Sequence, residues 1–179
     1  MLISEKHRAV FLHNPKCAGT SISKALKTNF EFYRLCDIDS SYVPDQHRKE
    51  IPERYRDFYT FCTYRNPYAR FVSTWAFRVE QKGLKMGFEE YAKWLNVLRS
   101  HYGLQIQFAS LCNEIFRFEE IVRQEYIDTP FGRVEFGHEN ITQRGTVSSY
   151  YTQGISESIV WRKFEPDFVE FGYRRREFQ

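Results

Sequence analysis

Residues 8–30, RAVFLHNPKCAGTSISKALKTNF, contain the strand, loop and helix from which the fold can be predicted. Ala9 to Leu12 form a continuous apolar run, which is typical of a strand covered on both faces in a parallel sheet. From Ser21 onward, apolar residues recur at steps of three and four, as they do on one face of a helix. Residues 13–21 therefore connect the end of a predicted parallel strand to the N-terminus of a predicted helix.

This loop has the features of an anion-binding site. The first turn of a helix has backbone N–H groups without helical partners, and their dipoles sum to a partial positive charge. Gly19 allows close approach of a phosphate, Thr20 and Ser21 add hydroxyl groups, and a further full charge comes from Lys16. The loop is not a nucleotide-binding G-x-x-x-x-G-K-[ST] loop, because Asn14 replaces its first glycine and Thr20 replaces its lysine.

A second strand, turn and helix is predicted further along the chain. Residues 58–64 are β-branched and aromatic, as in a strand, and Arg65-Asn66-Pro67 ends the run. A helix then begins near Pro67, where the missing N–H costs nothing. Ser73 lies eight residues after Arg65, about two helical turns on, and can face back toward the strand end. Arginine suits bidentate phosphate binding, so this turn is a second candidate anion site.

Both loops resemble signature segments of the sulfotransferase family. The family pattern H-x-P-K-x-A-G-T-S is matched by residues 13–21, and the pattern R-[DN]-P-x-x-R-x-x-S is matched by residues 65–73. The ending DFVEFGY, residues 167–173, is similar to the D-x-x-x-F-G-Y terminus of carbohydrate-type members. The resemblance implies an α/β, three-layer, P-loop-like fold with a central, mostly parallel sheet flanked by helices. The length agrees with one sulfotransferase-like domain over residues 1–179.

The resemblance implies transfer of the sulfuryl group from 3′-phosphoadenosine-5′-phosphosulfate (PAPS) to a hydroxyl or, as second choice, an amine; a carbohydrate is one candidate acceptor. Lys16 would neutralise the bridging oxygen as it leaves, and no metal would be required. Arg65 and Ser73 would grip the 3′-phosphate, while Arg70 would either contact the cofactor indirectly or hold its helix through a salt bridge. Arg144, in a segment resembling the family's R-x-G loop, is a second candidate for that phosphate or a lid residue in solvent. The implied cofactor-binding residues are Pro15, Lys16, Cys17, Ala18, Gly19, Thr20, Ser21, Arg65, Ser73 and Arg144.

A histidine is the expected general base for the acceptor's proton, because its ordinary pKa lies near neutrality. His47 and His13 are the main candidates, and His138 is a weaker one. His47 precedes the strand that leads to the second signature, and a catalytic histidine occupies a comparable place in the carbohydrate branch of the family. His13 lies beside the first loop, which it could equally brace. We favour His47, although each of these residues could also be a surface or structural histidine.

The composition limits the other classes of function. A net charge of +3 is too small to predict nucleic-acid binding, although it suits an anionic cofactor. The N-terminus, MLISEKHRAV, has no apolar stretch long enough for a signal peptide or a membrane span. The four cysteines lack metal-ligand spacing and are interpreted as reduced thiols. We therefore expect a cytoplasmic protein that acts on a small-molecule or carbohydrate acceptor, with a homo-oligomeric partner as one way to complete its acceptor cleft.

Two other functions stay open. A small-molecule kinase of the P-loop class would share the architecture, but it would need a Lys-[ST] pair at residues 20–21. No strand-end carboxylate suits Mg²⁺, since Asp37 and Asp57 lack a matching context. The third hypothesis is a nucleotide-binding module that has lost catalysis. ATP binding with Mg²⁺ would favour the kinase, and binding of 3′,5′-bisphosphoadenosine without turnover would favour the module.

The remaining segments are predicted from local pattern alone. The expected elements are a strand at 30–36, helical turns within 45–57, helices at 88–100 and around 104–111, a strand entering a helix at 114–122, a long irregular loop of functional importance at 126–154, a helix within 156–173 and a solvated basic tail at 174–176.

Overall fold

The structure is a computed structural model that describes residues 1–35, 50–95, 103–137 and 145–178. It divides into two compact units. The first unit contains Met1–Tyr64 and Gln107–Asn140, and the second contains Arg65–Ile106 and Ile141–Gln179.

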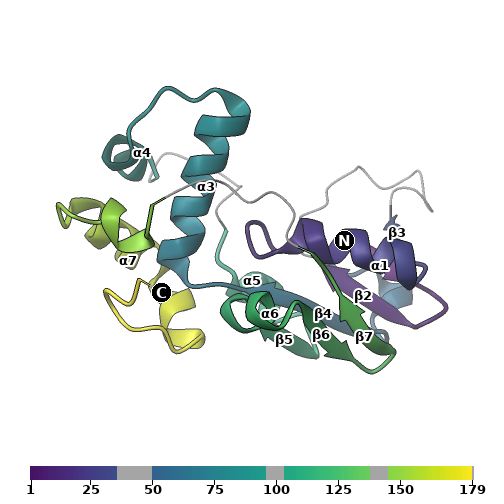
Figure 1. Cartoon of the computed structure of the whole chain (residues 1–179). Helices are drawn as coiled ribbons and strands as arrows, with labels where there is room; N and C mark the ends of the chain where they lie inside the picture. Colours follow the sequence, from purple (N-terminus) through teal and green to yellow (C-terminus); the bar gives the residue numbers. More distant parts are fainter. Residues whose placement is uncertain (36–49, 96–102, 138–144, 179) are drawn as a thin grey trace. The chain divides into compact units, whose positions relative to one another are not determined.

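A five-stranded sheet forms the centre of the first unit (Figure 1). Its strands lie in the order β3-β1-β2-β4-β5. Strands β2, β4 and β5 are parallel, whereas β1 is antiparallel to both of its neighbours. The bounds are β1 Leu2–Ser4, β2 Ala9–Leu12, β3 Tyr33–Arg34, β4 Tyr59–Tyr64 and β5 Glu114–Arg117.

The sheet is mixed. The prediction of a mostly parallel sheet is therefore correct for β2, β4 and β5 and wrong for the edge formed by β1 and β3. Residues 5–8 alone connect β1 to β2. A connection this short can join only antiparallel neighbours, because a parallel pair needs a crossover of a dozen or more residues. The expected strand at 30–36 is also reduced to the two residues of β3, which pair at the edge with β1. The expected strands at 9–12 and 58–64 are confirmed as β2 and β4.

Apolar clusters cover both faces of this sheet. Ala9 and Phe11 of β2 belong to one cluster, and Val10 and Leu12 belong to the other. This alternation confirms that β2 is covered on both faces, as the apolar run predicted. The first cluster receives Ile22, Ala25 and Leu26 from helix α1, which spans Gly19–Asn29 and carries the predicted apolar stripe.

The segment expected as a long irregular loop contains regular structure instead. Strands β6 (Tyr126–Thr129) and β7 (Gly132–Glu135) form an antiparallel hairpin. Val134 of β7 is fully buried in the cluster that contains α1, so the hairpin is part of the core. The 3₁₀ helix η2 (Val147–Tyr150) lies further along. Ile127 and Phe136 belong to the same cluster, but Pro130 and the glycines at 132 and 137 made the segment look like a loop.

The other short helices follow the local predictions more closely. A strand entering a helix at 114–122 is confirmed as β5 and α6 (Phe118–Gln124). The helix expected around 104–111 is the single turn α5 (Ile106–Ala109). In the described part of 45–57, the helical turns reduce to the 3₁₀ helix η1 (Glu53–Tyr55).

Helices dominate the second unit, with α3, α4 and α7 labelled in Figure 1. Helix α3 (Pro67–Lys82) confirms the helix predicted to begin near Pro67. Helix α4 spans Phe88–Trp94, and the residues beyond 95 in the expected helix lie outside the described residues. Helix α7 (Ile155–Glu170) continues through Pro166 with a non-helical residue at Phe164, because proline removes an N–H donor from the helix.

The basic tail at 174–176 is exposed, as predicted, but Arg175 also forms an ion pair that the sequence did not predict. Its guanidinium donates to both carboxylate oxygens of Glu157, at 3.0 and 3.2 Å. The Glu157 side chain is buried and also accepts a 2.6 Å hydrogen bond from the hydroxyl of Tyr68. Burial alone would raise the pKa of Glu157, but the hydrogen bonds from Arg175 and Tyr68 outweigh it and lower that pKa. The side-chain amide of Asn66 donates to the main-chain oxygen of Glu177, so the tail packs on the start of α3.

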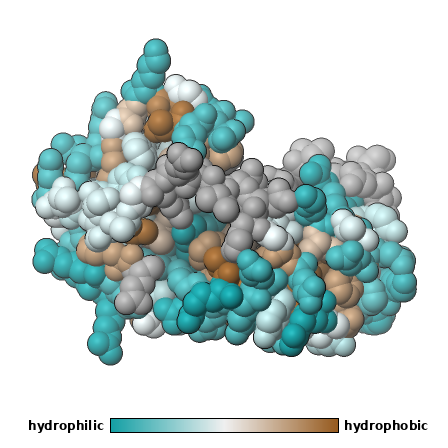
Figure 2. Space-filling model, viewed as in Figure 1, coloured by the Kyte–Doolittle hydropathy of each residue, from teal (hydrophilic) through white to brown (hydrophobic). Residues whose placement is uncertain are grey.

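Hydrophilic residues are widespread on the face shown in Figure 2, with smaller hydrophobic areas between them. Among the described residues, no helix combines the length and the apolar character that crossing a membrane requires. The three described cysteines, Cys17, Cys62 and Cys112, are free thiols, and the first two are buried.

Candidate functional site

The first signature segment forms the loop between β2 and α1, as predicted. Within it, Lys16 and Ala18 have left-handed backbone conformations, with φ of 67° and 62°. Such a conformation costs a non-glycine residue roughly 1–2 kcal/mol. Residues that alternate between the right- and left-handed regions direct successive N–H groups into a concave anion-binding nest. The two strained residues therefore lie in the loop for which the sequence predicts an anion-binding site.

Gly19 serves a purpose that the sequence did not reveal. Its backbone is not left-handed, so the glycine is not needed for its φ angle. Instead, a Cβ atom at this position would lie 2.3 Å from the imidazole ring of His13. His13 is half-buried and packs its ring on the first residue of α1. Glycine is thus required here by close packing between the two ends of the loop.

Two side chains join this loop to the neighbouring strand β4. The side-chain amide of Asn14, which is fully buried, donates to the main-chain oxygen of Thr63 at 2.9 Å. The hydroxyl of Thr63 in turn donates to the main-chain oxygen of Cys17. In the sequence, Asn14 stands out only as a departure from another motif, and no local signal marks Thr63. The parallel pairing of β2 with β4 brings them together.

The N-terminus of α1 is favourable for an anion. Its N-cap is Ala18, and within the described residues no side chain caps this end and no acidic residue lies in the first turn. The first helical hydrogen bond runs from the N–H of Ile22 to the oxygen of Ala18, so the N–H groups of residues 19–21 precede it. Thr20 is exposed, whereas Ser21 is buried and Lys16 is half-buried. The helix therefore presents its partial positive charge beside a lysine.

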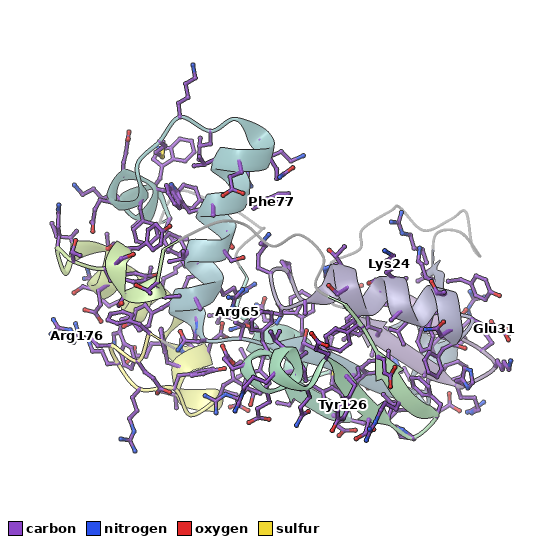
Figure 3. All side chains as sticks on the ribbon, viewed as in Figure 1. Lys24, Glu31, Arg65, Phe77, Tyr126 and Arg176 are labelled. Atoms are coloured by element: carbon purple, nitrogen blue, oxygen red, sulfur yellow. The ribbon has the colours of Figure 1, made fainter. Side chains whose placement is uncertain are left out.

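The second signature segment forms the start of α3 in the second unit, and Figure 3 labels Arg65 there. The side-chain oxygen of Asn66 caps the helix, accepting hydrogen bonds from the N–H groups of Tyr68 and Ala69 at 2.9 and 3.4 Å. Pro67 occupies the first turn, as expected. Arg65 and Ser73 are both buried, with 7% of each residue exposed. Burial of an arginine at a helix start is costly without anionic or hydrogen-bonding partners.

Arg70 lies on the same helix and is 4% exposed. Its guanidinium donates to the main-chain oxygen of Gly103 at 3.1 Å. The same positive charge lowers the pKa of the buried Asp167, although burial, the larger effect, raises it. The sequence left two roles open for Arg70, and these contacts favour the structural one.

Three residues singled out from the sequence lie outside the described residues. His47, His138 and Arg144 fall in the segments 36–49 and 138–144. The assignment of the general base and of the second phosphate-binding arginine therefore stays a prediction. In the parts of the chain that the structure describes, no group of three or more His, Cys, Asp or Glu side chains could hold a metal ion.

The first unit is thus a mixed α/β structure with a candidate anion-binding loop at the carboxyl end of a parallel strand. The family model described as "Sulfotransferase family" matches residues 1–126, which is most of the chain and includes both signature segments. The chain belongs to the sulfotransferase family, which suggests sulfuryl transfer as its activity. Comparison with curated proteins and comparison with solved structures gave no significant match.

Proposed function

We propose that the protein transfers the sulfuryl group of PAPS to a hydroxyl acceptor, or as second choice an amine, and that a carbohydrate is among its acceptors. We also propose that residues 1–179 act as one sulfotransferase-like domain of P-loop-like fold in the cytoplasm. The observation that carries the proposal is the loop of a sulfotransferase-family chain in which Lys16 and Ala18 are left-handed directly before an uncapped helix. An anion repays the cost of that backbone.

The first loop fits the 5′-phosphosulfate of PAPS. When bound, the cofactor supplies an activated sulfuryl group joined to a phosphate oxygen. The N–H groups at residues 17–21 and the hydroxyls of Thr20 and Ser21 are suited to that anionic group. Lys16 adds a mobile cation that stabilises negative charge as it develops on the leaving oxygen. The brace between Asn14 and Thr63 holds the loop in this conformation before binding.

Arg65 and Ser73 are proposed to hold the 3′-phosphate. Arg65 is buried just before α3 and Ser73 is buried within that helix, and a guanidinium can donate two parallel hydrogen bonds to a phosphate. Arg144 is proposed as a second ligand of that phosphate. The complete proposed set is Pro15, Lys16, Cys17, Ala18, Gly19, Thr20, Ser21, Arg65, Ser73 and Arg144.

His47 is proposed as the general base that takes the acceptor's proton. The packing of His13 on Gly19 supports a bracing role for His13, because a ring fixed against the backbone is held as a structural element. His13 remains the alternative base.

Direct assay tests the proposed activity. The protein is incubated with PAPS and a library of hydroxyl, amine and carbohydrate acceptors, and products are detected by the mass added by one sulfuryl group. We expect turnover that persists in EDTA. Loss of turnover on chelation, restored by Mg²⁺ with ATP as donor, would favour the kinase instead. Binding of 3′,5′-bisphosphoadenosine without turnover on any acceptor would favour a non-catalytic module.

A further inference from the structure

Gln105 forms two hydrogen bonds with the main chain of Arg65. Its side-chain oxygen accepts from the N–H of Arg65 at 3.0 Å, and its side-chain nitrogen donates to the oxygen of Arg65 at 2.8 Å. Arg65 lies between the end of β4 and the start of α3, outside the regular hydrogen bonding of either element. A buried main-chain N–H and C=O each need a partner, and one amide side chain supplies both. Gln105 is itself fully buried.

Asp167 of α7 holds Gln105 in turn. One carboxylate oxygen accepts from the N–H of Gln105 at 2.9 Å, and the other accepts from the N–H of Ile106 at 3.0 Å. Asp167 is fully buried, and Arg70 is the nearby positive charge that favours its ionised form. Gln105 thus links two segments that are far apart in sequence: its side chain bonds to the main chain of Arg65, and its own N–H bonds to Asp167. All of these residues belong to the second unit.

We propose that Gln105 and Asp167 are positioning residues for Arg65. They determine how strongly the protein prefers a nucleotide that carries a 3′-phosphate over one that lacks it. This inference rests on the proposed role of Arg65 in binding the 3′-phosphate. A guanidinium stands at the end of a long side chain, so a small rotation of its main chain displaces the donor groups by a large distance. Fixing the main chain in advance removes part of the ordering cost of binding.

A merely structural network would behave differently. If Gln105 only filled a polar gap in the core, its removal would weaken every ligand equally through a less stable fold. If it positions Arg65, its removal weakens ligands that carry a 3′-phosphate and spares those that lack one. The ratio of the two affinities therefore separates the two roles, because a general loss of folded protein cancels from the ratio.

The experiment measures the affinities of 3′,5′-bisphosphoadenosine and AMP by calorimetry for the wild type, Gln105→Leu and Gln105→Glu. Gln107→Leu is the matched control, since Gln107 is exposed and lies two residues along the same segment. We expect Gln105→Leu to lose at least fivefold in bisphosphate affinity while AMP affinity changes less than twofold. Gln105→Glu keeps an acceptor for the N–H of Arg65 but loses the donor to its oxygen, so its loss should be smaller. Gln107→Leu should retain the wild-type ratio.

A second measurement follows the exchange of the Arg65 amide hydrogen in the same variants. We expect faster exchange in Gln105→Leu and wild-type exchange in Gln107→Leu. Equal losses for both ligands, or faster exchange with an unchanged ratio, would overturn the positioning role while leaving the proposed function intact. A wild-type ratio near one would instead overturn the 3′-phosphate assignment, and the positioning role with it. If Gln105→Leu does not fold, Gln105→Glu decides by the same ratio, and an unchanged ratio overturns the proposal.

Discussion

The side-chain amide of Asn14 donates a 2.9 Å hydrogen bond to the main-chain oxygen of Thr63, which lies 49 residues further along the chain. The bond crosses from the first signature loop to the neighbouring parallel strand β4. Thr63 completes the connection by donating from its hydroxyl to the oxygen of Cys17. The asparagine that distinguishes this loop from a G-x-x-x-x-G-K-[ST] loop is therefore one of its braces.

Replacing Asn14 with alanine should lower the free energy of unfolding by roughly 1–3 kcal/mol, because the buried oxygen of Thr63 loses this donor. Denaturant unfolding at equilibrium measures the change. Asn29→Ala is the control, since Asn29 is exposed at the end of α1. Equal unfolding free energies for the two variants would show that the Asn14 bond contributes nothing.

Gly19→Ala should destabilise the protein by about 1–3 kcal/mol, because the added methyl group would overlap the ring of His13. Thermal unfolding detects this, and the double variant Gly19→Ala with His13→Ala should recover part of the loss. Gly137→Ala is the matched control, since a Cβ atom there meets no atom within 4 Å. A Tm for Gly19→Ala that matches the control would rule out the packing constraint.

Lys16→Ala should reduce the turnover rate by about a hundredfold or more, since it removes a charge directed at the leaving oxygen. Steady-state kinetics with PAPS measures the effect. Lys24→Ala is the control, because Lys24 is exposed on α1 (Figure 3). It tests whether the loss of any lysine near the loop lowers turnover to the same extent. The role assigned to Lys16 fails if both variants lose turnover equally.

The wild type should bind 3′,5′-bisphosphoadenosine more than tenfold more tightly than AMP, and Arg65→Ala should erase that preference. Leaving a buried arginine without its phosphate partner costs on the order of 2–5 kcal/mol. Calorimetry gives both affinities, and Arg78→Ala, further along α3, should keep the preference. A preference that survives in Arg65→Ala would place the 3′-phosphate elsewhere.

His47→Ala should lose roughly a hundred- to ten-thousandfold in turnover while keeping its affinity for 3′,5′-bisphosphoadenosine, as expected of a general base. His13→Ala should lose both, because its ring packs on Gly19 within the loop. Rates measured from pH 6 to 9 in both variants, beside bisphosphate titrations, separate a base from a brace. Full turnover of His47→Ala across that range would transfer the role to another residue.

Local pattern predicted the parts of the site that lie within one stretch of chain. It predicted the strand at 9–12, the loop at 13–21 and the helix that follows, because strand and helix periodicities extend over only a few residues. The helix start at Pro67 was readable for the same reason. The family resemblance carried by these segments was correct.

The antiparallel edge of the sheet and the β6–β7 hairpin were missed. Pairing direction depends on the length of a connection and on which neighbour a strand finds, and neither is encoded in the strand's own residues. Val134 is buried because the hairpin packs against the cluster around α1, although the surrounding residues read as a loop.

By itself, the sequence determined the family, the two signature segments and the elements that present them. Only the tertiary structure decided which side chains hold those segments: Asn14 with Thr63, His13 with Gly19, and Gln105 and Asp167 with Arg65. The physical reason is distance along the chain. Gln105 lies 40 residues from Arg65 and 62 from the Asp167 that holds it, so no local pattern relates them. Their hydrogen bonds exist because folding removes water from polar groups that must then find one another.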